Sequence, residues 1–283
     1  MAWNTNNFRL ASATLFAFFA AFSGASGYKL ELQSRADTAA PLEVYMANFG
    51  SYDDIITGNV GAGSAFANID ISPSFQIAGL TYDGKYRMAL ETRSDAAGPL
   101  EVYMATFDTY SDLMLSNLGS GSGFTQIDVA PNFQIASIAY DGKYRVLLES
   151  RADTSAPLEA YMASFDTYGD LLNAHLGTGS AFTQLDVSPS FRIAGLTFDG
   201  KYRMALETRT DASSPLEVYM ANFDTFDDLM NANLGSGSAY SQIDISPDYQ
   251  IVGLAYEPSP VPEPSTIVVL GIGILPFIRK RRK

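Results

Sequence analysis

Residues 41–47 read Pro-Leu-Glu-Val-Tyr-Met-Ala, and the same heptapeptide recurs at 99–105 and 215–221. At 157–163 it returns with one change, Ala160 in place of valine. The spacing is 58 residues each time, and four such units fill residues 28–259. A fixed period of this length is typical of proteins built from stacked supersecondary units. The sequence therefore predicts one domain of four equivalent parts over 28–259.

Each unit contains the features of four short antiparallel strands. Asp83-Gly84 is a strong two-residue hairpin turn because glycine tolerates the positive φ that such turns need. After it, Tyr86, Met88 and Leu90 alternate with polar residues, as in a strand. For this unit we expect strands at residues 75–82, 85–93, 100–107 and 124–129, and a helix at 108–118 with Asp108 as its N-cap. Four such strands per repeat are typical of a β-propeller blade.

The two ends of the repeat region fall inside one hairpin. Residues 28–33 align with the second strand of that hairpin, and residues 249–256 align with its first strand. Pairing of these two segments would close the array and remove its open edges. We therefore expect an all-β, four-bladed β-propeller whose ring is closed by its N- and C-terminal strands. Two packed sheets, or a closed dimer of such rings, are the structural alternatives.

The hairpin sequence also carries a family resemblance. Tyr140-Asp-Gly-Lys-Tyr-Arg145, with Glu159-Ala-Tyr-Met162 nearby, resembles the repeat of TolB-type propellers. The resemblance implies a ring of similar blades. The present period is longer, and the rings of that family have more blades.

The last residues of the chain have three parts in a fixed order. A Pro-Glu-Pro motif comes first, an apolar run over 266–278 follows, and five basic residues end the chain at 279–283. This arrangement resembles the PEP-CTERM sorting signal of Gram-negative, exopolysaccharide-producing bacteria. The motif comprises Val261, Pro262, Glu263, Pro264 and Ser265. The resemblance implies recognition by exosortase, a membrane protease that removes the tail and passes the protein to the cell surface.

The apolar run of this tail is short for a permanent membrane span. Residues 266–278 would form a helix about 20 Å long, whereas the hydrocarbon core of a bilayer is roughly 30 Å thick. Pro276 weakens it further as a span. We expect transient insertion in the inner membrane through this tail. A simple C-terminal anchor is the alternative.

The N-terminus has the pattern of a secretory signal peptide. Arg9 precedes an apolar stretch at 10–22, and Ser23-Gly24-Ala25 supplies the small residues of a cleavage site. The expected organisation is a signal peptide at 1–27, the repeat domain at 28–259 and the sorting tail at 260–283. Because the exported chain has no cysteine, its fold must be stable without disulfides.

The charge of the repeat region limits its partners. Residues 28–259 hold 12 of the 18 basic residues and 30 of the 31 acidic residues, a net charge of −18. Such a surface repels nucleic acid and anionic lipid. The partners that we expect are an exopolysaccharide or a surface protein.

The residues that most catalysts need are scarce. The chain has no cysteine and one histidine, His175, whose equivalents in the other units are asparagines. Four near-identical units also offer equal sites rather than one asymmetric catalytic centre. We therefore expect a non-catalytic protein without an obligatory cofactor. A glycoside-active enzyme using Asp and Glu alone is the alternative, and it would need acids outside the repeat, namely Asp53, Asp227 and Asp248.

Some repeated residues are candidates for ligand binding. One aspartate precedes a proline turn in each unit: Asp70, Asp128, Asp186 and Asp244. These aspartates either bind calcium or accept hydrogen bonds within their own turns. We favour hydrogen bonding within the turn. A second repeated acid is open to the same two readings: Asp54, Asp112, Asp170 and Asp228. An aromatic position after each Gly-rich loop would stack on sugars in a lectin with one site per blade: Phe66, Phe124, Phe182 and Tyr240.

Overall fold

The computed structural model describes residues 26–34, 44–67, 75–92, 102–125, 133–150, 160–183, 191–208, 216–245 and 249–259. Of the predicted signal peptide at 1–27, residues 1–25 lie outside these ranges, and so does the predicted sorting tail at 260–283. Residues 26 and 27 are described, and Gly27 begins a strand. Within them, the chain is all-β apart from four short helices.

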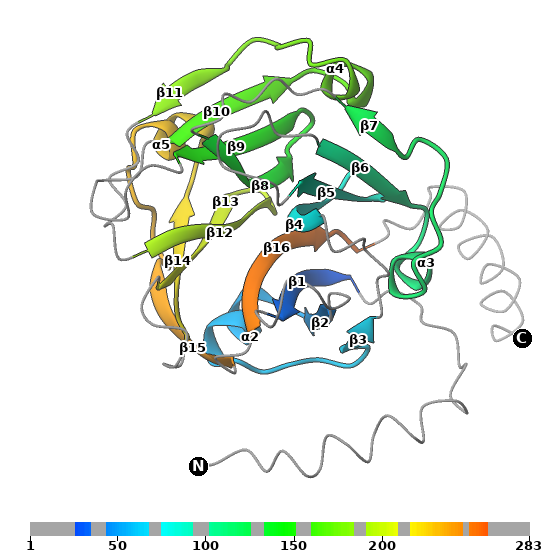
Figure 1. Ribbon diagram of the computed structural model, residues 1–283. Helices are drawn as coiled ribbons and strands as arrows, with labels where there is room; N and C mark the ends of the chain where they lie inside the picture. The colour runs from blue at the N-terminus through cyan, green and yellow to red at the C-terminus, as the bar shows by residue number, and fades with distance from the viewer. Residues whose placement is uncertain are drawn as a thin grey trace, which may run out of the picture.

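The strands form four antiparallel sheets of four strands each (Figure 1). Sheet I consists of β16 (Tyr249–Glu257), β1 (Gly27–Ser34), β2 (Val44–Phe49) and β3 (Ala65–Ala67). Sheet II consists of β4 (Phe75–Tyr82), β5 (Tyr86–Thr92), β6 (Val102–Phe107) and β7 (Gly123–Thr125). Sheet III consists of β8 (Phe133–Tyr140), β9 (Tyr144–Ser150), β10 (Ala160–Phe165) and β11 (Ala181–Thr183). Sheet IV consists of β12 (Phe191–Phe198), β13 (Tyr202–Thr208), β14 (Leu216–Phe223) and β15 (Ala239–Ile245). The alternative of two packed sheets is therefore wrong.

The two ends of the repeat region pair with each other. β1 runs antiparallel to β16, from Gly27 opposite Glu257 to Ser34 opposite Tyr249. Sheet I therefore joins the first and last strands of the chain, while each other sheet is built from consecutive strands. The predicted pairing of the terminal strands is confirmed.

Neighbouring sheets pack through their inner strands and through apolar side chains between them. β4 contacts β8 and β16, and β12 contacts the same two strands, so the four inner strands lie around a common centre (Figure 1). One cluster of buried residues fills each of the four junctions: I–II, II–III, III–IV and IV–I. The centre is tight, since a Cβ added to Gly79 would lie 2.8 Å from the backbone nitrogen of Ile138.

Both faces of the second strand of each sheet are buried. The predicted hairpin turn is present, with Gly84 at φ 103° between β4 and β5. Tyr86 and Met88 face the core as expected, but the alternating polar residues Arg87 and Glu91 are also buried, at 8% and 1% exposure. The reason is that each sheet is covered on both sides by its neighbours.

The expected helix over 108–118 is shorter than predicted, and Asp108 is not its N-cap. The helix α3 spans Tyr110–Met114, and its N-cap is Thr109, whose side chain accepts a hydrogen bond from the Asp112 backbone N–H. Asp108 instead forms an ion pair with Lys85 at 2.6 Å. The equivalent helices are α2 (Tyr52–Thr57), α4 (Tyr168–Leu172) and α5 (Phe226–Met230).

In the second unit, only parts of the predicted third and fourth strands lie within the described ranges. β6 is described from Val102 and β7 over Gly123–Thr125, and residues 100, 101 and 126–129 lie outside the described ranges. In the fourth unit, β14 (Leu216–Phe223) matches the positions equivalent to 100–107, and β15 (Ala239–Ile245) begins one residue before the position equivalent to 124. The predicted boundaries are therefore confirmed for β14, whereas the helix α5 of this unit is shorter than predicted.

Candidate functional site

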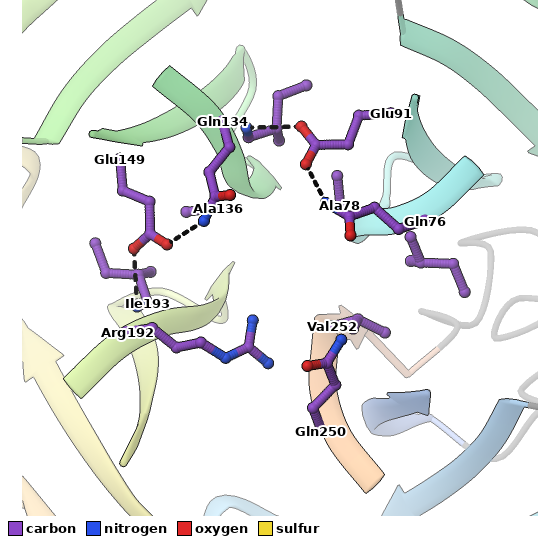
Figure 2. Close-up of a pocket in the computed structure, with 12 residues that line it drawn as sticks. Gln76, Ala78, Glu91, Gln134, Ala136, Glu149, Arg192, Ile193, Gln250 and Val252 are labelled. Carbon is purple, nitrogen blue, oxygen red and sulfur yellow. Dashed lines mark hydrogen bonds between the residues drawn. The ribbon is translucent and has the colours of Figure 1, made fainter. Parts of the chain in front are cut away.

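A small polar pocket lies where the first residues of the four inner strands converge (Figure 2). Its volume is about 40 Å³, which is enough for a few water molecules. Four equivalent side chains point into it, one from each inner strand: Gln76, Gln134, Arg192 and Gln250. Buried carboxylates stand behind two of them, those of Glu91 and Glu149.

Each carboxylate of this pocket links two sheets. Glu149 accepts a hydrogen bond from the Gln134 amide of its own sheet at 2.6 Å and another from the Ile193 backbone N–H of the next sheet at 3.2 Å. Glu91 binds in the same way to the Gln76 amide and to the Ile135 N–H, the latter at 3.0 Å. The acids therefore satisfy backbone donors at the II–III and III–IV junctions.

The remaining two junctions use variants of the same link. At the IV–I junction, Glu207 pairs with the guanidinium of Arg192 and accepts from the Ile251 N–H at 2.8 Å. Arg192 also donates to the Ile251 carbonyl at 2.6 Å. At the I–II junction a neutral amide takes the place of the acid. The Gln33 side chain accepts a hydrogen bond from the Ile77 N–H at 3.1 Å. One link of this kind thus spans each of the four junctions.

A second series of contacts crosses the same junctions at the opposite end of the sheets. At the III–IV junction, Arg145 pairs with Asp141 at 3.0 Å and lies 4.1 Å from the ring centre of Phe226 in α5. Tyr202 of sheet IV donates its hydroxyl proton to the same Asp141 carboxylate. Burial and this hydrogen bond to Asp141 raise the pKa of Tyr202, so its hydroxyl remains a donor. Equivalent contacts join sheets II and III through Arg87 and sheets IV and I through Arg203.

The I–II junction departs from this pattern. Lys29 stands where the others have arginine, and Glu257 stands where they have the turn aspartate. The Lys29 ammonium lies 3.8 Å from the Glu257 carboxylate and 5.1 Å from the Tyr110 ring centre. Glu31, two residues along β1, is fully buried, and neither of its oxygens has a hydrogen-bond partner among the described residues.

One exposed aliphatic residue recurs in the loop after each helix. These residues are 47–58% exposed, although they are large and apolar: Val60, Leu118, Leu176 and Leu234. An exposed polar residue precedes each of them: Asn59, Asn117, His175 and Asn233. His175 follows α4 and is exposed, like the three equivalent asparagines. This repeated apolar and polar pair is the surface feature that sequence reasoning missed, and its signal was the 58-residue period of the apolar positions.

The predicted ligand residues are only partly within the described residues. Asp70, Asp128 and Asp186 lie outside them, and for Asp244 only the backbone, in β15, is described. The predicted stacking residues have described backbones in the outer strands, each opposite the tyrosine of the neighbouring strand: Phe66 opposite Tyr45, Phe124 opposite Tyr103, Phe182 opposite Tyr161 and Tyr240 opposite Tyr219. Exposure of these four rings stays untested. The sorting motif Val261, Pro262, Glu263, Pro264 and Ser265 lies outside the described residues.

The second set of repeated acids has a structural role. In the first turn of α3, the Asp112 carboxylate accepts a hydrogen bond from the Thr109 hydroxyl at 2.7 Å. The Asp112 backbone N–H donates to the same hydroxyl oxygen at 3.1 Å. Asp170 and Asp228 repeat these contacts in α4 and α5. Among the described residues, no group of three or more acids and histidines is arranged to hold a metal ion. These acids therefore bind the N-cap threonines of their helices, which favours the interpretation of hydrogen bonding within a local turn over calcium binding.

The comparisons with known proteins give no family for this chain. No protein-family model matches it, and no curated protein matches it. Among the residues that the structure describes, no helix is long and apolar enough to cross a membrane.

Proposed function

We propose that this chain is an exported, non-catalytic binding protein of the cell surface or extracellular matrix. In this proposal its four sheets form a closed four-bladed β-propeller, and an exosortase-like protease sorts it through the tail at 260–283. Its partners are glycans of an exopolysaccharide or surface proteins, bound at sites repeated once per unit. The pairing of β1 with β16 and the links across all four junctions support the ring.

The single observation that carries the proposal is the repeated exposed pair of an aliphatic and a polar residue. Single exposed apolar residues are ordinary on protein surfaces, but here one is exposed at the same place in every unit, and this recurrence fits contact with a partner. Four equivalent positions suit a ligand that itself repeats, such as a polysaccharide, because several weak contacts then act together.

The small polar pocket favours a structural or binding role for its carboxylates over glycoside hydrolysis. A glycosidase needs one carboxyl group to protonate the leaving group and a second to attack or to activate water. Glu149 already accepts two hydrogen bonds, and the pocket holds about 40 Å³, far less than a sugar ring requires. Of the three alternative acids, Asp53 and Asp227 lie in the first turns of α2 and α5, at different junctions, and Asp248 lies outside the described residues.

A glycan array followed by titration calorimetry on the purified full chain tests the proposal. We expect saturable binding of an extracellular polysaccharide with about four equivalent sites. Replacing Leu118, Leu176 and Leu234 together by serine should lower the apparent affinity at least tenfold, because avidity over four sites is lost.

Leu115→Ser is the matched control for this triple variant. Leu115 is 53% exposed in the same loop, but its equivalents in the other units are Thr57, Asn173 and Asn231. It should leave the affinity unchanged. Absence of binding to every glycan and to surface-protein extracts, or equal losses in the control and the triple variant, would contradict the proposal.

A further inference from the structure

Glu31 is a buried acid that the other units lack. It lies in β1, between β16 and β2, and its side chain is 0% exposed. The equivalent residues are Ala89, Leu147 and Ala205, all apolar. Neither carboxylate oxygen has a hydrogen-bond partner among the described residues. The sheet that joins the first and last strands thus carries a carboxyl group where the other sheets carry an apolar side chain.

The carboxyl group lies at a close contact between sheets I and II. A Cβ added to Gly253 of β16 would be 2.8 Å from a Glu31 oxygen and 2.8 Å from the Leu80 Cβ of β4. On the other side, the residue of β2 opposite Glu31 is the fully buried Met46. An ionised carboxylate at this place would have neither water nor a donor to stabilise it.

The charged and titratable groups around Glu31 are engaged elsewhere or stay neutral. On β1, Lys29 turns its ammonium toward Glu257 of β16, at 3.8 Å. From β5, Tyr86 donates to the same Glu257 carboxylate, and burial raises its pKa. From α3, Tyr110 has a pKa raised to about 12 by burial, with a smaller contribution from the charge of Glu31. No hydrogen bond from any of these groups to Glu31 exists in the described residues.

We propose that Glu31 is a pH-sensitive latch of the I–II junction: with its carboxyl protonated the junction is closed and dry, and ionisation in alkaline surroundings loosens β1. The exported protein would meet the pH of the medium directly, so this latch responds to the surroundings of the cell. The inference does not depend on the partner that the protein binds.

The direction of the effect follows from proton binding. Burial raises the pKa of Glu31 from its ordinary 4.5 to about 8. Between these two values the folded chain holds one proton more than the unfolded chain, so stability falls as pH rises. The stability that the protonated Glu31 contributes is fully present below about pH 4.5 and is lost by about pH 8. In this window the unfolding equilibrium constant should rise about tenfold per pH unit from this group alone.

Hydrogen exchange of the full chain from pH 5 to pH 9 tests the latch, with two variants measured at the same pH values. Glu31→Gln keeps the volume and removes the ionisation, while Lys29→Arg removes lysine titration and copies the arginine of the other units. From pH 5.5 to pH 7.5 we expect the opening constant of β1 amides, relative to that of Glu31→Gln, to rise at least thirtyfold. β9 of sheet III should show a smaller rise.

The Lys29→Arg variant should keep the pH dependence of the wild type. The proposal is overturned if Glu31→Gln and the wild type share one pH profile, or if Lys29→Arg removes the dependence. It is also overturned if β1 and β9 open in parallel in the wild type. When exchange is too slow to follow, the thermal unfolding midpoint measured against pH compares the wild type with the two variants.

Discussion

The III–IV and I–II junctions occupy equivalent positions and differ in chemistry. At III–IV, Arg145 is 3.0 Å from Asp141 and donates to the Ser164 hydroxyl at 2.6 Å. At I–II, Lys29 is 3.8 Å from Glu257. Asp141 is fixed by its hairpin turn, whereas Glu257 lies where the chain ends interrupt that turn and Pro258 replaces the glycine. The interruption of the repeat inside a hairpin thus removes a preorganised aspartate and leaves a looser ion pair.

The largest expected effect comes from breaking the better-formed junction. Arg145→Met should destabilise the protein by about 3–5 kcal/mol, because Asp141 is then left buried without its charge partner. Lys29→Met should cost about 1–2 kcal/mol, since Glu257 keeps 18% exposure and contact with water. Urea unfolding at pH 7 measures both. Equal losses would show that the two junctions are energetically equivalent.

A smaller effect is expected from making the III–IV link resemble the I–II link. Glu149→Gln keeps an acceptor for the Ile193 N–H but removes the negative charge, as Gln33 does for Ile77. The loss should be about 1 kcal/mol, because charge-assisted hydrogen bonds are stronger than neutral ones. Chemical denaturation gives the value, with Gln134→Glu as a control that adds charge at the same place. A loss above about 3 kcal/mol would mean that the amide of Gln33 is not an adequate substitute.

The reverse exchange at the I–II junction should stabilise the protein slightly. Lys29→Arg introduces the planar guanidinium that the other three junctions use above an aromatic ring. We expect a gain of about 0.5–1 kcal/mol from stacking on Tyr110 and from a shorter contact with Glu257. Differential scanning calorimetry at pH 7 would detect it. A loss of stability would show that the packing around β1 is adapted to lysine.

The smallest effect is expected from the tyrosine hydroxyls of the helices. Tyr168 donates to the Gly121 carbonyl of sheet II's outer loop at 2.9 Å, whereas Phe226 occupies the equivalent place without a hydroxyl. Tyr168→Phe should therefore cost only about 0.5–1 kcal/mol. Phe226→Tyr provides the matched test, with an expected gain of similar size. A change of the same sign in both variants would indicate that the ring position, rather than the hydroxyl, sets the contact.

The repeat and the interrupted hairpin made much of the fold predictable. The 58-residue period indicated four units, and the segments at 28–33 and 249–256 indicated a shared sheet, which the pairing of β1 with β16 confirms. The helix boundary was less accurate, since both Asp108 and Thr109 are suitable caps. Only the structure shows that Lys85 engages Asp108 and leaves Thr109 to cap α3.

The candidate site was harder to predict because its residues look structural or solvated in sequence. The alternation of β5 suggested one polar face, yet Arg87 and Glu91 lie between sheets. The link from Glu91 to the Ile135 backbone joins residues 44 apart in sequence, a relation that no local pattern specifies. Substitutions between sister units, such as Gln33 and Lys29, were visible in the sequence, but their meaning depended on which sheets face each other.

The chain enters and leaves the repeat domain at one point. The hydroxyls of Ser26 and Ser259 lie 2.9 Å apart, at the end of sheet I from which α2 and the loop of Val60 also project. A tether attached there would turn this side of the four sheets, with its four exposed aliphatic residues, toward the anchoring surface. Release from the tether would uncover them, so detachment itself would decide when those residues become accessible to a partner.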